Sequence, residues 1–168
     1  MNRDFKQRII TISGVKNSGK TTLIEKLLKE FCADGLRVAV LKHDGHDFTC
    51  DIPGTDTYRF SAAGAYGTAI FSKHRMFVHK IGTEETEKSL IAQFPEADLI
   101  LLEGFKEKPF PKLEIIRNGN SQHPASNPVG RFLFVTDIPN ADFGGETLSL
   151  NDPKAIADRI LQYAKNGK

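Results

Sequence analysis

The segment from Gly14 to Thr21 constrains this chain more than any other feature of its sequence. Its letters, GVKNSGKT, match the pattern G-x-x-x-x-G-K-[ST] at every fixed position. A β-branched run at residues 9–13 precedes the segment, and residues 20–33 follow it with helical spacing that Gly35 is expected to end. Glycines let such a turn curl so that backbone N–H groups and the start of a helix face an anion. The sequence therefore predicts a phosphate-binding loop at the tip of the first strand.

A loop of this kind divides the chemistry among a few residues. The lysine reaches the β- and γ-phosphates of a nucleoside triphosphate, and the following hydroxyl ligates Mg²⁺. We therefore expect Lys20 to act on the triphosphate and Thr21 to hold the metal ion. The residues expected to bind the nucleotide are Gly14, Val15, Lys16, Asn17, Ser18, Gly19, Lys20, Thr21 and Thr22.

Apolar runs and helical spacing alternate along the rest of the chain, which predicts an α/β fold. Beyond the first strand, the predicted strands are residues 38–41, 98–103, 113–117 and 132–136. The further predicted helices are residues 55–63, residues 84–94 and a last helix that Asp152 caps and Pro153 begins. Residues 66–72 and 76–80 are predicted to pair as a β-hairpin. The pattern is typical of a P-loop NTPase, a mostly parallel twisted sheet flanked by helices, here with an inserted hairpin. A chain of 168 residues suits a single nucleotide-binding domain over residues 1–168.

Ligands of parallel sheets bind beyond the carboxyl ends of the strands, so strand-end acids are candidate site residues. Glu103 ends the most apolar run, where a Walker-B acid would hold Mg²⁺ or orient an attacking water. We therefore expect Glu103 and Lys20 to be the catalytic groups. Asp51 and Asp56 flank the rigid Pro53-Gly54 turn and are expected to be further metal ligands.

Two other sets of residues leave alternatives open. Lys106 and Lys112 could bind an anion, or could belong to a solvated basic loop.

The chain has no Asn-Lys-x-Asp, the guanine-recognition element of many GTPases. Asp137 ends a late strand, and we hypothesise that it accepts hydrogen bonds from guanine.

The composition narrows the classes of function. A net charge of +2 gives no reason to expect binding to nucleic acid or to a membrane surface. No apolar run reaches the roughly 18 residues of a membrane-spanning helix, and the polar start leads directly into a strand rather than into a signal peptide. Cys32 and Cys50 form no C-x-x-C pair and are expected to be reduced thiols. We therefore expect a cytoplasmic protein.

Several of these segments occur together in one family. The sequence resembles the molybdopterin-guanine dinucleotide biosynthesis protein B (MobB) family of small GTP-binding proteins. The resemblance covers most of the chain, from about residue 9 to residue 137. It rests on residues 17–23 (NSGKTTL), on Lys42-His43 with His46, on residues 51–56 (DIPGTD), on residues 63–65 (AGA), on residues 103–106 (EGFK) and on Pro111-Lys112.

The resemblance implies a function more specific than phosphate binding. Proteins of this family look like GTP-binding accessory proteins for attaching GMP to molybdopterin, while a partner guanylyltransferase (MobA) performs the transfer. They are homodimers with weak GTPase activity and act as adapters among cofactor-synthesis enzymes. For this chain the resemblance implies GTP and Mg²⁺ as ligands, phosphate binding by residues 14–22, and a metal site lined by Glu103 and the 51–56 turn. The hairpin at residues 66–80 is the expected dimerisation element.

Two other classes of function remain open from the sequence. A P-loop kinase would use the same loop to phosphorylate a small acceptor, with Arg117 and Arg131 in a lid. A metal-delivering GTPase would use His43, His46 and Cys50. No arginine can be assigned from the sequence as a finger within the chain, so any hydrolysis is expected to be slow.

Overall fold

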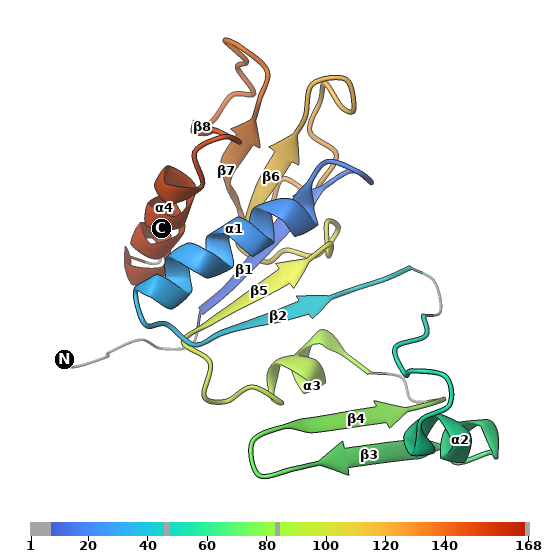
Figure 1. The fold of residues 1–168 in the computed structure, drawn as a ribbon. Helices are drawn as coiled ribbons and strands as arrows, with labels where there is room; N and C mark the ends of the chain where they lie inside the picture. The colour runs from blue at the N-terminus through green and yellow to red at the C-terminus, as the bar shows by residue number, and fades with distance from the viewer. Residues whose placement is uncertain (1–7, 46–47, 83–84, 167–168) are drawn as a thin grey trace. The chain divides into compact units, whose positions relative to one another are not determined.

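A computed structural model describes residues 8–45, 48–82 and 85–166 of the chain (Figure 1). Its contacts divide the chain into two compact units, one of residues 1–43 with residues 90–168 and one of residues 44–89. None of the helices within the described ranges combines the length and the apolar character that crossing a bilayer requires.

The first unit is built on a six-stranded sheet with the order β2-β5-β1-β6-β7-β8. Every neighbouring pair in this sheet is parallel. The expected α/β architecture with a mostly parallel sheet is therefore confirmed. The strands are β1 (Arg8–Gly14), β2 (Val38–Lys42), β5 (Leu99–Glu103), β6 (Lys112–Ile116), β7 (Arg131–Thr136) and β8 (Thr147–Ser149).

Two long helices, α1 (Lys20–Ala33) and α4 (Pro153–Asn166), pack against each other and cover one face of this sheet (Figure 1). Alternate strand residues point into this layer, and residues such as Ile12, Leu101 and Ile115 are almost completely buried there. The intervening residues, such as Ile100 and Leu102, form a second core with Phe105 on the other face. Because both faces are covered, β5 and β6 are buried along their whole length, and β5 is apolar from Leu99 to Leu102, as parallel strands usually are.

The ends of the long helices follow the signals in the sequence. Gly35 adopts a φ of 74° after α1, and the N–H of Leu36 donates to the carbonyl of Phe31 at 3.0 Å. This is a Schellman ending, which favours glycine at the left-handed position. At the start of α4, the Asp152 carboxylate accepts a hydrogen bond from the N–H of Ala155 at 3.0 Å. Both predicted helix boundaries are therefore confirmed.

Two elements differ from the prediction. The helix expected at residues 84–94 is only α3 (Glu87–Ile91), because Thr86 and Ser89 exchange capping hydrogen bonds at its start and Pro95 follows its end. Residues 83–84 lie outside the described residues. Strand β8 was not predicted, since its three residues carry no apolar run and it exists only through parallel pairing with β7.

The second unit contains the predicted hairpin. Strands β3 (Gly67–Phe71) and β4 (Met76–Lys80) pair in antiparallel register, and the helix α2 (Asp56–Ala62) precedes them. Large apolar side chains are exposed on this hairpin, with Phe71 82% and Met76 76% exposed. Exposed apolar patches of this kind often mark interaction surfaces.

A buried network of charges on β6 connects the long loops of the first unit. The Lys112 ammonium is fully buried and donates to the carbonyls of Lys106, Lys108 and Asn127. These three carbonyls use all three of its donors. Neither alternative left open for Lys112, an anion contact or a solvated basic loop, describes this residue, because its buried ammonium anchors two loops.

Glu114, two residues further along β6, is 1% exposed and anchors the loop at residues 118–130. Its carboxylate accepts hydrogen bonds from the N–H groups of Ala125 and Ser126, from the Ser126 hydroxyl at 2.7 Å and from Arg131 at 2.6 Å. Burial raises the pKa of Glu114, but these hydrogen bonds outweigh burial and hold that pKa below its ordinary value.

We predict that Glu114→Ala lowers the free energy of unfolding at pH 7 by about 3–5 kcal/mol, since it leaves the Arg131 guanidinium buried without its partner. Denaturant titration measures this change. The control is Glu146→Ala, which removes a more exposed partner of Arg159 and is expected to cost about 1 kcal/mol or less. Equal losses for the two variants would contradict the assigned role of the network.

The difference in stability between the wild type and Glu114→Ala should also depend on pH. Because the folded-state pKa of Glu114 lies below its unfolded-state value of about 4.3, the carboxylate contributes its full stability above that pH. The contribution is lost as the pH falls through the lower, folded-state pKa. The difference in stability between the wild type and Glu114→Ala should therefore shrink on acidification below about pH 4.3.

Candidate functional site

The loop after β1 has the backbone shape that a phosphate cradle requires. Gly14, Asn17 and Gly19 adopt positive φ angles of 144°, 62° and 92°. A Cβ placed on Gly14 would lie 2.7 Å from the Ser18 hydroxyl oxygen and 2.8 Å from the carbonyl oxygen of Ile115 on β6. Only glycine permits this close approach of the loop to the neighbouring strand.

Lys20, the first residue of α1, folds back over the loop. Its ammonium donates to the carbonyls of Val15 at 2.7 Å and of Gly14 at 3.2 Å. Burial lowers the pKa of Lys20, the Glu103 carboxylate raises it, and the charges of Lys42 and Lys106 lower it again. The net result is a pKa below the ordinary lysine value. Three lysines thus bring positive charge to the carboxyl edge of the sheet.

Thr21 and Glu103 meet although they are far apart in the sequence. The Thr21 hydroxyl donates to Glu103 Oε1 at 3.1 Å. Parallel pairing of β1 with β5 places Ile12 opposite Glu103, and this register brings the strand end beside the loop. A hydroxyl and a carboxylate are the hard oxygen ligands that Mg²⁺ prefers.

The residues present fit a nucleotide with its metal ion. The Ser18 hydroxyl oxygen is buried inside the loop without a hydrogen-bond partner, so the cradle contains a polar group that a ligand can satisfy. Within the described residues, no group of three or more His, Cys, Asp or Glu side chains could hold a metal ion alone. A Mg²⁺ ion at Thr21 and Glu103 would therefore take its remaining ligands from phosphate and water, as is usual for this ion.

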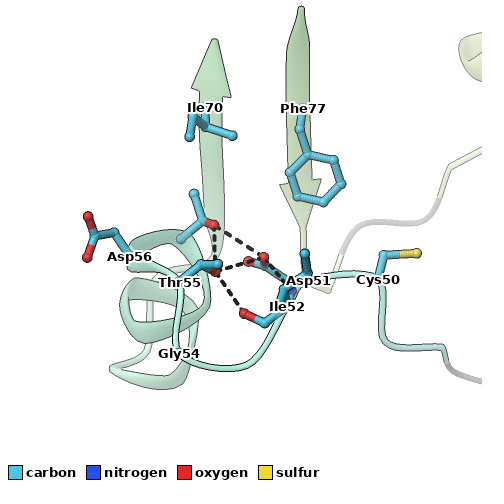
Figure 2. Close-up of a pocket in the computed structure, with 9 residues that line it drawn as sticks. Cys50, Asp51, Ile52, Gly54, Thr55, Asp56, Ile70 and Phe77 are labelled. Atoms are coloured by element: carbon cyan, nitrogen blue, oxygen red, sulfur yellow. Dashed lines mark hydrogen bonds between the residues drawn. The ribbon is translucent and has the colours of Figure 1, made fainter.

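Asp51 and Asp56 belong to the second unit, where they have different surroundings (Figure 2). Asp51 Oδ1 accepts hydrogen bonds from the N–H of Ile52 and from the hydroxyls of Thr55 and Thr57, which organises the turn before α2. Its other oxygen, Oδ2, is buried without a hydrogen-bond partner. The Asp56 carboxylate points away from Asp51, is 81% exposed and pairs with Arg59 at 3.6 Å. Metal binding by these two residues stays a prediction.

The pocket drawn in Figure 2 has a volume of about 630 Å³ and lies entirely within the second unit. Asp51 is on its wall together with Ile70 of β3 and Phe77 of β4. His43, which a metal-delivering GTPase would use, does not line this pocket. The ring of His43 lies 5.3 Å from that of Phe105 in the first unit, and His46 lies outside the described residues.

Asp137 follows β7 and is bonded to the turn that follows β6. Its Oδ1 accepts from the N–H of Asn118 at 2.7 Å, and its Oδ2 lies 3.7 Å from Nε of Arg117. The same turn reaches the P-loop, because Asn120 Nδ2 donates to the carbonyl of Lys16 at 3.2 Å. The sequence analysis did not predict this contact. No local motif marks it, and only the sheet order brings residues 117–121 beside residues 14–21.

The comparisons with known proteins agree with this geometry. The family model described as "Molybdopterin guanine dinucleotide synthesis protein B" matches residues 9–135. The "Molybdopterin-guanine dinucleotide biosynthesis adapter protein" of Escherichia coli is 31% identical to this chain, and the match covers 92% of each protein. The Haemophilus influenzae protein of the same description is 35% identical over 92% of this chain and 88% of its own length.

A solved structure extends the comparison to the fold. Bacillus subtilis MobB is 28% identical to this chain, with a TM-score of 0.74 and coverage of 92% of this chain and 96% of its own. Residues 9–135, which the family model matches, include the P-loop, Glu103 and the turn after β6. The chain therefore belongs to the molybdopterin guanine dinucleotide synthesis protein B (MobB) family.

Proposed function

We propose that this protein is a GTP-binding adapter in the synthesis of molybdopterin guanine dinucleotide, with slow GTP hydrolysis as an accompaniment. The observation that carries the proposal is the contact between Thr21 of a complete P-loop and Glu103, in a chain that belongs to this family. The relatives whose names include "adapter protein" supply the cellular role. The guanylyltransferase MobA and other cofactor-synthesis enzymes are the proposed partners.

The residues of the chain divide the work as follows. Residues 14–22 bind the phosphates, and the Lys20 ammonium exchanges the carbonyls of Gly14 and Val15 for phosphate oxygens. Thr21 and Glu103 would hold Mg²⁺, and the ion would supply positive charge to the phosphates. Glu103 also orients the attacking water. Nothing in this set forms a covalent intermediate, so the positioned charges provide the catalysis.

The guanine preference rests on the family, with Asp137 as the candidate base contact. Its place after β7, at the carboxyl edge of the sheet, supports this assignment. Both of its oxygens already face donors from Asn118 and Arg117, so a guanine base would have to compete with these groups.

The protein is proposed to act as a homodimer through the hairpin β3–β4. The exposed apolar side chains of Ile70, Phe71, Met76 and Val78 support this role, since burying them stabilises a dimer. The cytoplasm is the proposed compartment, and the two exposed free thiols, Cys32 and Cys50, are typical of a reducing environment.

The proposal predicts that Lys20→Ala weakens GTP binding in the presence of Mg²⁺ by about 10- to 100-fold, since a charged hydrogen bond to phosphate is lost. Calorimetric titration of GTP and ATP measures both the loss and the base preference. In a reconstituted guanylyl transfer to molybdopterin, the wild type should raise the yield of the partner enzyme and Lys20→Ala should not.

The control for this experiment is Lys154→Ala, which removes an exposed lysine of α4 that pairs with Asp158. Its affinity and its effect on the yield should equal those of the wild type. Wild-type binding by Lys20→Ala would rule out the P-loop as the nucleotide site.

Glu103→Gln keeps the size of the side chain and its hydrogen bond to Thr21 but removes the charge. We expect it to weaken GTP binding with Mg²⁺ by about tenfold but not to weaken binding in EDTA, because without the metal ion the Glu103 carboxylate only repels the phosphates. Glu146→Gln is the matched control. An equal loss in EDTA would show that Glu103 supports the fold of the loop rather than the metal ion.

The dimer proposal predicts that Phe71→Glu combined with Met76→Glu converts the protein to a monomer. Two charges on the apolar hairpin surface would have to be desolvated in the dimer. Analytical ultracentrifugation measures the change in mass. Lys73→Glu, in the exposed turn of the same hairpin, should leave the wild-type mass unchanged, and an unchanged mass for the double variant would exclude this surface as the interface.

A further inference from the structure

The turn at residues 117–121 brings an arginine to the phosphate cradle. We propose that Arg117 contacts the phosphate chain of the bound nucleotide, and that Asp137 is a positioning residue that holds Arg117 in place. The inference deepens the proposed function and rests on it, because it assumes that a nucleotide occupies the P-loop. It assigns the cradle a cation from within the chain, an arginine that the sequence analysis named only as a lid residue of the kinase alternative.

Arg117 lies beside Gly19 of the phosphate-binding loop. Its Nη1 lies 3.2 Å from the point that a Cβ on Gly19 would occupy. Gly19 is the N-cap residue of α1, where the partial positive charge of the helix favours an anion. The backbone N–H groups of such loops surround the α- and β-phosphates. The guanidinium therefore lies beside the part of the loop that is expected to hold these phosphates.

The turn that carries Arg117 is fixed by several hydrogen bonds. The carbonyl of Arg117 accepts from the N–H groups of Asn120 and Ser121 at 3.1 and 2.9 Å, and its own N–H donates to the Ser121 hydroxyl. Asn120 ties the turn to Lys16 of the P-loop, and Asp137 ties Asn118 to the end of β7. The backbone of Arg117 is thus held relative to the cradle on both sides.

The geometry of the guanidinium permits two partners at once. Asp137 faces its Nε at 3.7 Å, while Nη1 lies on the side of the P-loop. The planar fork of an arginine suits simultaneous contact with a carboxylate and with a phosphate. The side chain of Arg117 is 48% exposed, so a phosphate can reach it without breaking a buried ion pair.

This arrangement changes the expected role of Asp137. A carboxylate that reads guanine discriminates between bases, whereas a carboxylate that positions Arg117 strengthens the binding of every nucleotide alike. The effect of Asp137 should then pass through Arg117. The two roles give different results in one set of titrations.

The test is calorimetric titration of the full chain with GTP, GDP, ITP and ATP, each with Mg²⁺. Arg117→Ala is expected to weaken GTP and GDP by a similar factor of about 10, because the contact is to phosphates that both nucleotides share. Arg117→Lys, which keeps the charge and loses the fork, should recover part of the affinity.

Asp137→Ala should weaken all four nucleotides by the same factor, and the double variant should bind no more weakly than Arg117→Ala alone. Two findings would each overturn the inference: wild-type affinity in Arg117→Ala, or a loss in Asp137→Ala that affects GTP more than ITP and ATP. Denaturant titration of each variant excludes loss of the fold as the cause.

Arg37→Ala is the matched control. Arg37 forms the same kind of pair, with its N–H on Asp98 at 2.8 Å and its Nε at 3.5 Å, but at the opposite edge of the sheet. Its nucleotide affinities should equal those of the wild type. If the wild type bound no nucleotide, or if Lys20→Ala bound normally, the proposed function itself would fail. If binding depended on Lys20 and not on Arg117, only the present inference would fail.

Discussion

The parallel pairing of β1 with its two neighbours is the interaction on which the rest of this structure depends. On one side, the register of β1 with β5 places Ile12 opposite Glu103, which brings that carboxylate to the hydroxyl of Thr21. On the other side, β6 approaches so closely that only glycine fits at position 14. The phosphate cradle and its acid are therefore consequences of strand order and register rather than of the loop alone.

Buried polar contacts then fix the loops that the sheet leaves at its carboxyl edge. Lys112 and Glu114 on β6 hold the loops on either side of that strand through backbone groups, at the cost of burying two charges. The turn at residues 117–121 continues from the same strand and reaches the P-loop through Asn120. The buried strand β6 thus also determines where the loops around the site lie.

The predictions that held depend on local chemistry. The P-loop, the Schellman ending at Gly35 and the cap at Asp152 each involve residues within a few positions of one another, so their types and spacing are sufficient. The features that the sequence did not predict depend on how loops and strands fold onto one another. For Lys112 an anion contact and a solvated loop both stayed open, because the sequence does not show that the carbonyls of Lys106, Lys108 and Asn127 surround its ammonium. Strand β8 was missed because its only support is its neighbour β7.

By itself, the sequence determined the class of fold, the phosphate-binding loop and the family resemblance, since each is written in short segments with strict backbone requirements. It also made Glu103 a candidate, because a Walker-B acid lies at the end of an apolar strand. Only the tertiary structure decided that Glu103 lies on Thr21, that Lys112 is sequestered, and that Arg117 and Asp137 meet beside Gly19. The physical reason is that Thr21 and Glu103 are 82 positions apart and Arg117 and Asp137 follow different strands, so that sheet order brings each pair together. The carbonyls around the Lys112 ammonium meet it only once the loops on both sides of β6 have folded over that strand.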